Sequence, residues 1–289
     1  MFRLPGFSPL LFTLFFACAA PCAFPQTGAG SLDPDYAPML TADGDFSLAA
    51  QAPGGKFVVA GKFDFIAGAP RRSLARLSAD GSVEAFAPPQ LPGSNFTPLS
   101  LAALDDGRVA ACYGSPDTLI LGGSAGDGSW LRVFAADGAL ESEIVASSVT
   151  NGSATTATAV TRVAGRGNVV YFAKATTFHL LLSPSPNSFS RSTTIEAIGL
   201  AGAVAVKPVF NGAVTGLLPL ADGAVLVWGN FSQVSSATAG SSARPGLARL
   251  NADLSLDAWV PSGVPEGAVV SAAAGPGGTM YVATLAGTS

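Results

Sequence analysis

Charge is scarce in this chain. Only 12% of its 289 residues are Asp, Glu, Lys or Arg, and the formal net charge is −4. The sequence contains only these lysines: Lys56, Lys62, Lys174 and Lys207. A nucleic-acid partner requires a cluster of cations to neutralise its phosphates, and an anionic lipid surface makes a similar demand. We therefore expect no nucleic-acid partner and no adhesion to acidic lipid.

Metal-binding and nucleophilic side chains are equally few. The chain has one His and three Cys. If Cys18 and Cys22 leave with an N-terminal leader, Cys112 remains alone and can form neither an internal disulfide nor a multi-cysteine metal site. Cys112 and His179 both lie in apolar, strand-like segments. We interpret Cys112 as a small core residue and His179 as a core or rim residue. We assign no catalytic, metal-binding or cofactor-binding residues, and we expect no cofactor.

Long helical patterns are also missing. No extended stretch has apolar residues at helical spacing between caps. Hydrophobic residues nevertheless make up 48% of the chain, alongside 34 Gly and 21 Pro. Gly permits positive φ and Pro presets turns, so this composition predicts an all-β fold of many short strands.

The N-terminus has the features of a signal peptide, which we place at residues 1–26. Arg3 is followed by an apolar run from Leu10 to Ala20, and cleavage is expected between Cys22 and Gln26. The run is shorter than the roughly 20 residues that cross a bilayer. We expect a secreted or cell-surface protein without a transmembrane segment in its mature chain. A buried N-terminal strand or helix is the alternative.

Cys18 raises the possibility of lipidation. The preceding residues, Phe15-Phe16-Ala17, loosely resemble a bacterial lipoprotein box, although Phe15 stands where Leu is usual. A lipid-anchored form is therefore a second, less favoured interpretation of the leader.

Internal similarity carries most of the information in the sequence. Residues 55–63 resemble residues 223–231, which lie 168 positions further along. Residues 71–77 resemble residues 244–250 at an offset of 173. Both offsets are close to three periods of about 57 residues, which is in the range of propeller blades.

Turn signals occur throughout the chain at a similar spacing. The recurring turn glycines are Gly55, Gly107, Gly167, Gly223 and Gly278. A second turn recurs at Asp80-Gly81, Asp137-Gly138 and Asp253-Leu254. Asp-Gly is typical of tight hairpins in which both central residues have positive φ. Each period thus predicts four short antiparallel strands.

One such unit is too small to bury its own apolar faces, so its copies must stack. Radial stacking predicts a β-propeller of four-stranded blades, with about five blades or an incomplete ring. A β-solenoid is the alternative, but its coils are usually shorter than this period.

The repeat resembles a known family. Gly55-Lys56, Gly61-Lys62-Phe63, the strand at residues 71–77, Asp80-Gly81-Ser82 and Leu256-Asp257 together resemble the bacterial delta-60 β-propeller repeat. The match is nearly complete in the first and fourth units and is limited to turns and apolar strands in the others. The resemblance implies an exported bacterial propeller and no known reaction.

We divide the chain into the leader and a repeat domain at residues 27–289. The units lie at about 46–88, 99–142, 157–206 and 214–261, with a partial unit at 268–289. Residues 31–36 resemble a closing strand, so the two ends could complete one blade. Alternatively, the chain is a fragment of a longer array.

Three segments rich in Ser, Thr and Ala are expected to form exposed loops. They are residues 142–160, 183–194 and 232–243. Propeller ligands usually meet such loops, so these segments are the expected place of a binding site.

Several motifs suggest chemistry but have simpler explanations. Residues 122–126 spell G-x-S-x-G, yet a turn and strand follow where a nucleophile elbow needs a helix. The adjacent Asp105 and Asp106 point to opposite faces of a strand and are better suited to making a turn. Arg76 and Arg249 occupy matching positions, which predicts a repeated structural role in ion pairs or in capping carbonyls between blades.

Calcium needs only oxygen ligands, which short acidic pairs can supply. Asp33 and Asp35 form one pair, and Asp43 and Asp45 form another. Neither has the ligand spacing of an EF-hand loop. Hydrogen bonds from Asp side chains to the nearby backbone explain both pairs without a metal.

The sequence favours a noncatalytic, exported propeller that acts as a binding or scaffold module. Its partner would be an extracellular protein or polysaccharide of unknown identity. The first alternative is a propeller enzyme, a lyase or hydrolase acting on extracellular polysaccharide. The second is an architectural spacer within a larger exported protein.

Overall fold

A computed structural model describes most of the chain beyond its N-terminal segment. The described residues are 42–89, 97–114, 130–180, 188–202, 207–236, 240–261, 269–275 and 279–284. The chain divides into Met1–Ala37 and Pro38–Ser289, and every described residue belongs to the second part. The expected signal peptide therefore lies outside the described residues. Across the described stretches, no helix has the length and apolar character needed to cross a membrane.

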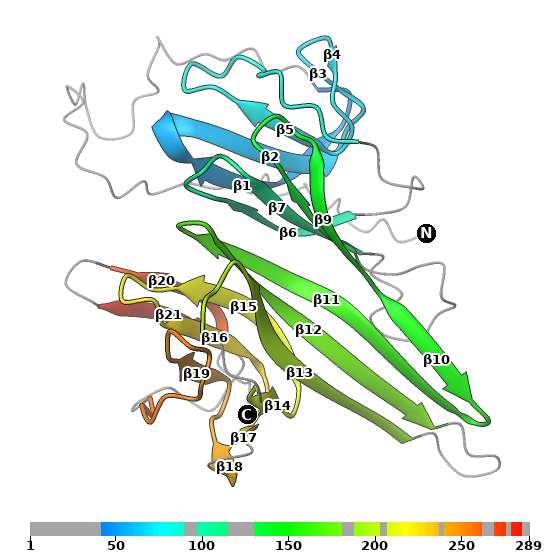
Figure 1. Ribbon diagram of the computed structural model, residues 1–289, viewed down its shortest axis with the longest axis vertical. Helices are drawn as coiled ribbons and strands as arrows, with labels where there is room; N and C mark the ends of the chain where they lie inside the picture. Colours follow the sequence, from blue (N-terminus) through cyan, green and yellow to red (C-terminus); the bar gives the residue numbers. More distant parts are fainter. Residues whose placement is uncertain are drawn as a thin grey trace, which may run out of the picture. The chain divides into compact units, whose positions relative to one another are not determined.

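Antiparallel strands form nearly all of the regular structure (Figure 1), which confirms the all-β fold class. The first sheet, repeat 1, has the order β1-β2-β5, and the second, repeat 2, has the order β6-β7-β8-β9. Their strands are β1 (Asp45–Ala52), β2 (Lys56–Lys62), β5 (Leu74–Leu77), β6 (Thr97–Ala103), β7 (Val109–Gly114), β8 (Trp130–Phe134) and β9 (Leu140–Val145). A short 3-10 turn, η1 (Pro53–Gly55), joins β1 to β2, and the small hairpin β3 (Phe65–Ile66) and β4 (Ala69–Pro70) precedes β5.

The third sheet is larger, with the order β10-β11-β12-β13-β14-β17-β18. Its strands are β10 (Ser147–Asn151), β11 (Ala154–Arg166), β12 (Val169–Leu180), β13 (Ser188–Ile198), β14 (Val209–Phe210), β17 (Gln233–Ser236) and β18 (Gly240–Ala243). We refer to β11, β12 and β13 as repeat 3.

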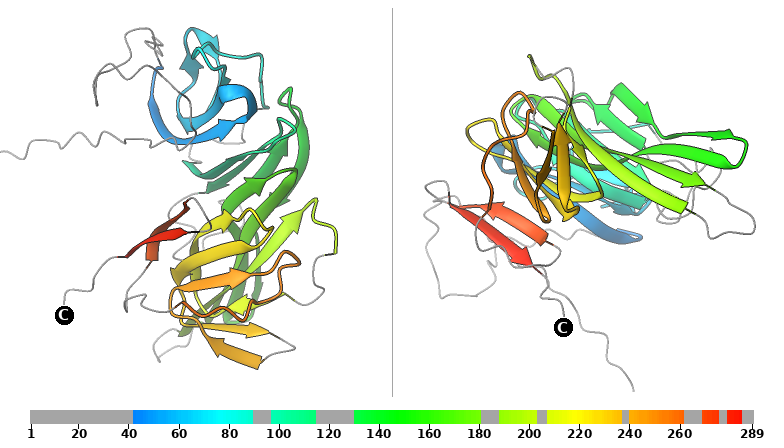
Figure 2. Two further views of the ribbon diagram at one scale, coloured as in Figure 1. Left: turned by 90° about the vertical axis from the view of Figure 1, so that its left-hand side faces the viewer. Right: turned by 90° about the horizontal axis from the view of Figure 1, so that it is seen from below.

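The remaining sheets follow the pattern of the first. Repeat 4 has the order β15-β16-β19, and repeat 5 is the β20–β21 hairpin. Their strands are β15 (Ala213–Pro219), β16 (Val225–Asn230), β19 (Leu247–Leu250), β20 (Val269–Ala274) and β21 (Met280–Thr284). The β20–β21 hairpin lies against β15 and β16, as the red strands in Figure 2 show.

The four-stranded blade is present in different degrees. Repeat 2 has four full strands. In repeats 1 and 4 the fourth strand is reduced to a single bridge, between Leu77 and Val83 and between Leu250 and Leu256. The first strands of consecutive repeats pack against one another, from β1 to β6, β11, β15 and β20. This serial stacking is the arrangement that the repeat predicted.

A β-bulge interrupts the first hairpin of every repeat at the same point. In repeat 1 the pairing passes from Phe46–Gly61 to Leu48–Ala60, so Ser47 is the extra residue. The corresponding extra residues are Leu99, Thr161, Thr215 and Val270. A bulge bends the strand and redirects the side chain that follows it. Its recurrence in β20 indicates that the last hairpin begins a repeat of the same kind.

The Asp-Gly turns differ from the expected hairpin type. At Asp106-Gly107, the Gly107 amide donates to Leu104 O at 3.0 Å, and the Leu104 amide donates to Arg108 O at 2.9 Å. Gly107 has a φ of 85°, whereas Asp106 is not among the residues with positive φ. The expectation of positive φ at both central residues is therefore wrong. The turn is a type I turn closed by a glycine bulge, which needs the left-handed conformation at one position only.

Repeats 1 and 4 share details that the sequence comparison did not include. Asp43 Oδ1 accepts hydrogen bonds from the backbone amides of residues 64–65, each at 2.9 Å. Asn211, which lies 168 positions later, accepts hydrogen bonds from the amides of residues 232–233 at 2.9 and 3.0 Å. Equivalent side chains therefore hold equivalent loops, and the two segments lie in like surroundings.

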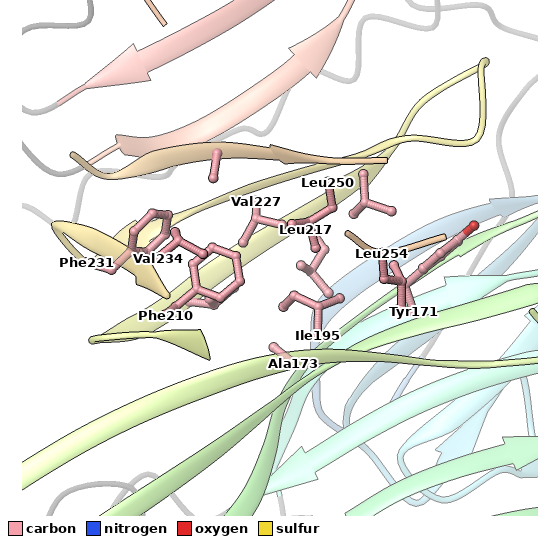
Figure 3. Close-up of a cluster of buried hydrophobic side chains, with 13 residues drawn as sticks. Tyr171, Ala173, Ile195, Phe210, Leu217, Val227, Phe231, Val234, Leu250 and Leu254 are labelled. Carbon is pink, nitrogen blue, oxygen red and sulfur yellow. The ribbon is translucent and has the colours of Figure 1, made fainter. Parts of the chain in front are cut away.

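The core is shared between repeats rather than enclosed within each one. Figure 3 shows a buried cluster to which repeats 3 and 4 both contribute. Its labelled members are Tyr171, Ala173, Ile195, Phe210, Leu217, Val227, Phe231, Val234, Leu250 and Leu254. A second cluster likewise joins repeat 2 to repeat 3 through Cys112, Leu131, Val160 and Phe172. Stacking is thus what removes the apolar faces from water.

The expected Ser, Thr and Ala-rich loops are largely strands. Residues 142–160 run through the end of β9, all of β10 and the start of β11. The described residues at 188–194 belong to β13, and β17 and β18 lie within 232–243. Paired hydroxyls help to explain the error, because Ser147 Oγ and Thr158 Oγ1 meet across the strands at 2.7 Å. Branched Thr side chains favour extended backbone, and a composition rich in Ser and Thr conceals this preference.

Candidate binding site

The first strands of repeats 1 to 4 line one cavity of about 250 Å³. We call this cavity the bulge pocket, because the residue that follows the bulge in each of repeats 1 to 4 lines it. These residues are Leu48, Ser100, Arg162 and Gly216, and Trp228 completes the pocket beside Gly216. Equivalent positions of four repeats therefore meet at one place with four different side chains.

Each of these residues pairs with a partner on the second strand of its repeat. The pairs are Leu48 with Ala60, Ser100 with Cys112, Arg162 with Ala173 and Gly216 with Trp228. Members of a cross-strand pair lie on the same face of a sheet. In repeats 1 and 3 the large side chain is on the first strand, whereas repeat 4 reverses the sizes.

Arg162 is the charged residue among the described residues that line the pocket. Its Nε donates to Thr215 O at 2.8 Å, and its Nη1 donates to Thr161 O at 2.6 Å. These bonds fix the guanidinium between the bulges of repeats 3 and 4. Burial lowers the pKa of Arg162 from its usual value, but the group remains a cation at neutral pH.

Trp228 reaches the pocket because residue 216 is glycine. A Cβ at position 216 would lie 2.0 Å from the indole ring of Trp228. The side chain of Trp228 is therefore packed directly over the backbone of Gly216, and only 8% of the residue is exposed. Its buried Nε1 has no hydrogen-bond partner within the described part of the chain.

The rest of the pocket is apolar or already hydrogen-bonded. Ser100 Oγ donates to Val163 O at 2.8 Å and accepts from Val163 N at 3.0 Å, which links repeats 2 and 3. Leu99, Leu101 and Leu217 are the leucines of this part of the lining. The polar groups of the lining side chains that lack partners are thus donors of Arg162 and Trp228.

Arg76 and Arg249 have the repeated structural role that the sequence predicted. Arg76 Nε donates to Glu84 Oε2 at 2.6 Å, and its Nη1 donates to Gly107 O, in the next repeat, at 3.2 Å. Arg249 pairs with Asp257 at the matching position. Both therefore tie the third strand of their repeat to the fourth.

A second pair of arginines also recurs, which the motif alone did not explain. Arg71 and Arg244 each donate through one Nη to the preceding carbonyl and through the other to the carbonyl of Glu84 or Asp257. Arg71 lines a smaller cavity of about 190 Å³. Because these arginines serve the backbone in the same way in both repeats, we interpret them as structural.

Cys112 is fully buried, which confirms its interpretation as a core residue. Its Sγ donates to Val160 O at 3.1 Å. Burial raises the pKa of the thiol to about 12. His179 lies half-buried in β12, opposite Thr155.

Two aspartates of these acidic pairs, Asp43 and Asp106, accept hydrogen bonds from backbone amides. Asp106 Oδ1 accepts from Arg108 N at 3.1 Å, which confirms its place in the turn. Asp43 accepts the loop amides described above. Asp33, Asp35 and residues 122–126 lie outside the described residues. Elsewhere in the described chain, no group of three or more His, Cys, Asp and Glu side chains is placed to hold a metal ion.

The serially stacked antiparallel sheets and the recurring bulge define a protein of the β-propeller repeat class. Residues 53–85 and 220–258 match the family model described as "Domain of unknown function (DUF5122) beta-propeller". These two segments, in repeats 1 and 4, are thus similar to a β-propeller repeat family, which confirms the propeller-repeat resemblance inferred from the sequence. No curated protein matches the chain.

Sequence reasoning missed the bulge pocket altogether. Its residues carry no motif, and they converge only because each bulge shifts the register by one residue. One signal was present, since Val160-Thr161 and Val214-Thr215 are identical dipeptides placed before Arg162 and Gly216. Aligning these dipeptides would have shown that Arg162 stands at a repeated position.

Proposed function

We propose that this chain is an exported, noncatalytic β-propeller module that binds an extracellular ligand in the bulge pocket. The observation that carries the proposal is the convergence of equivalent positions from four repeats on one cavity. Residues that stabilise a repeat tend to recur in it, as Arg76 and Arg249 do. The pocket position instead differs among the four repeats that line the cavity, as expected of residues used for recognition.

The chemistry of the pocket supports binding rather than catalysis. Arg162 is the ionisable side chain among its described lining residues. General acid–base catalysis requires a group that gains and loses a proton near the working pH, and arginine stays protonated. The described contacts give no support to the lyase or hydrolase alternative.

Export is supported by the leader at residues 1–26. We propose that it directs the chain to the cell surface or the medium, where the ligand is carried by a protein or polysaccharide. Expression of the full chain in a bacterial host, followed by mass measurement of the exported protein, tests this. The expected mature N-terminus lies between Cys22 and Thr27. Full-length chain retained in the cytosol would contradict export.

Binding is tested with residues 27–289 on arrays of polysaccharides and surface proteins. Ala49 is exposed and lines the pocket, so Ala49→Trp should fill the cavity with little effect on folding. Ala273→Trp places the same side chain at an exposed site of β20, outside the described pocket lining. We expect Ala49→Trp to lose the array signal and Ala273→Trp to keep it. Equal signals from both variants would exclude the bulge pocket as the site.

A further inference from the structure

We infer that the bulge pocket recognises the carboxylate of a small organic acid through Arg162 and Trp228. This inference rests on the proposed binding function of the same pocket and names the chemistry of its ligand. Three features carry it: a cation without an acidic partner, a buried donor without an acceptor, and leucines among the lining residues.

Arg162 has a charge that the described structure does not neutralise. Arg76 and Arg132, by contrast, each form a salt bridge with a glutamate. Arg162 makes no salt bridge with any carboxylate in the described residues; its Nε and Nη1 bond backbone carbonyls and its Nη2 has no acceptor there. A partly buried charge is costly unless an opposite charge accompanies it. An anionic ligand would supply that charge.

Trp228 offers a second donor at the same place. More than nine-tenths of the residue is buried, its Nε1 lacks an acceptor, and the Nε1 edge of the indole lies at Gly216 in the pocket wall. Indole nitrogen and guanidinium can only donate hydrogen bonds. Two donors without acceptors select a ligand group that only accepts, and the positive charge selects an anion.

The walls distinguish among anions. Leu48, Leu101 and Leu217 are among the residues that line the cavity, and its volume of about 250 Å³ is small for a ligand site. Phosphate or sulfate would place unsatisfied oxygens against these leucines. A monocarboxylate with an aliphatic or aromatic body presents its two oxygens to the donors and its carbon atoms to the walls.

Arg162 could instead act solely as a link between repeats 3 and 4. Its bonds to Thr161 and Thr215 would then be its whole contribution. Such a role predicts a loss of folding stability in Arg162→Gln and no effect on any ligand. Folding stability and ligand affinity must therefore be measured on the same proteins.

The test is calorimetric titration of residues 27–289 with sodium acetate, hexanoate, benzoate and phenylacetate. Phenylacetamide and sodium phosphate are the matched probes that lack the charge or the apolar body. We expect hexanoate or an aromatic acid to bind about tenfold or more tightly than the amide, as charge-assisted bonds allow, and phosphate to bind least. Absence of binding by all four acids at about 10 mM, or binding of phosphate as tight as that of the acids, would overturn the inference.

The variants assign the effect to its residues. Arg162→Gln should weaken acid binding about tenfold or more, and Trp228→Phe, which removes the donor together with the smaller ring of the indole, should weaken it several-fold. Arg166→Gln removes an exposed arginine of the same strand and should bind as the wild type does. Near-ultraviolet circular dichroism and urea unfolding establish that each variant is folded.

Two results separate this inference from the proposed function. If the arrays show a ligand but Arg162→Gln binds acids like the wild type, the carboxylate site is wrong and the binding module stands. If acids bind and depend on Arg162 but the arrays stay silent, the pocket chemistry stands and the macromolecular partner is wrong.

Discussion

At the scale of single residues, burial decides the chemistry of the one thiol described. Cys112 lies in β7 with its side chain enclosed, and burial raises its pKa to about 12. The thiolate is the reactive form, so it is scarcely populated near neutral pH. We expect the chain of residues 27–289 to be inert to an aromatic disulfide reagent at pH 8 and to react fully in denaturant. Rapid reaction of the folded protein would show that β7 opens readily.

Glu84 is a residue whose charge supports the fold. Lys56 Nζ lies 2.7 Å from Glu84 Oε1 and Arg76 donates to Oε2, and these contacts lower the pKa of the carboxyl. Because the folded-state pKa is depressed, the contribution is complete above the unfolded pKa. It is lost as pH falls through the folded value. We expect Glu84→Gln to lower the free energy of unfolding by about 1 kcal/mol at pH 7.

The pH dependence provides the control for Glu84. The stability lost by Glu84→Gln should shrink as both proteins are taken to acid, since the wild-type carboxyl then becomes neutral as well. Glu141→Gln removes a more exposed acid, 3.7 Å from Arg108, and should change stability little. Urea unfolding from pH 7 down to acid measures both variants. An unchanged difference at all pH values would mean that Glu84 acts through packing and not charge.

At the scale of elements, the two matching loops before β5 and β19 use different residues for one conformation. Ser73 has a φ of 61°, and Gly246 at the corresponding position has a φ of 73°. The left-handed conformation costs a non-glycine residue roughly 1–2 kcal/mol. Replacing that residue by glycine recovers only part of this cost, because glycine also makes the unfolded chain more flexible and thereby stabilises the unfolded state. We expect Ser73→Gly to stabilise by about 0.5–1 kcal/mol and Gly246→Ser to destabilise, as measured by urea unfolding. Destabilisation by Ser73→Gly would show that the Ser73 side chain makes an important contact.

The pair beside the bulge of repeat 4 makes a second prediction for a hairpin. In repeat 1 the large residue of this pair, Leu48, is on the first strand and the small one, Ala60, is on the second. Repeat 4 has the opposite arrangement, with Gly216 on the first strand and Trp228 on the second. A side chain at position 216 would collide with the indole. Gly216→Leu should cost about 1–3 kcal/mol in the wild type and clearly less when combined with Trp228→Ala, which copies repeat 1. Unfolding of the four proteins of this cycle measures the coupling. Strictly additive costs would mean that backbone conformation, not the indole, demands glycine.

At the scale of the whole molecule, stability depends on neighbouring repeats. The cluster that contains Leu217 and Leu250 of repeat 4 also contains Tyr171 and Ile195 of repeat 3. An isolated segment of residues 207–261 would expose this face to water. We expect that segment to lack a cooperative thermal transition in circular dichroism, whereas residues 27–289 show one. Cooperative unfolding of the segment alone would show that a single repeat is self-sufficient.

The repeated parts of the fold were predictable because local chemistry repeats with them. Offsets of 168 and 173 residues correctly placed the strands and ion pairs of repeats 1 and 4, including the roles of Arg76 and Arg249. The Asp-Gly turns were located but assigned the wrong type. A dipeptide shows that a tight turn forms, whereas its twist depends on the bulge that closes it.

The strands of the third repeat and the pocket could not be predicted from local sequence patterns. Residues 142–160 appeared loop-like by composition, but cross-strand hydroxyl pairs and branched side chains hold them in strands. The pocket depends on four register shifts that no residue type marks. Both the strands at residues 142–160 and the pocket depend on which strands pair and in which register. A single sequence contains little information about such long-range pairing.

At the cross-strand pair beside each bulge of repeats 1 to 4, the backbone maintains the fold while the side chains are free to determine what the pocket contacts. Hydrogen bonding through the bulge belongs to the backbone, so it persists whichever side chain follows it. Evolution can therefore change Leu48, Ser100 or Arg162 singly, and Gly216 together with Trp228, without altering the pairing of the backbone. Related chains would then differ in the molecules they capture while keeping the same scaffold.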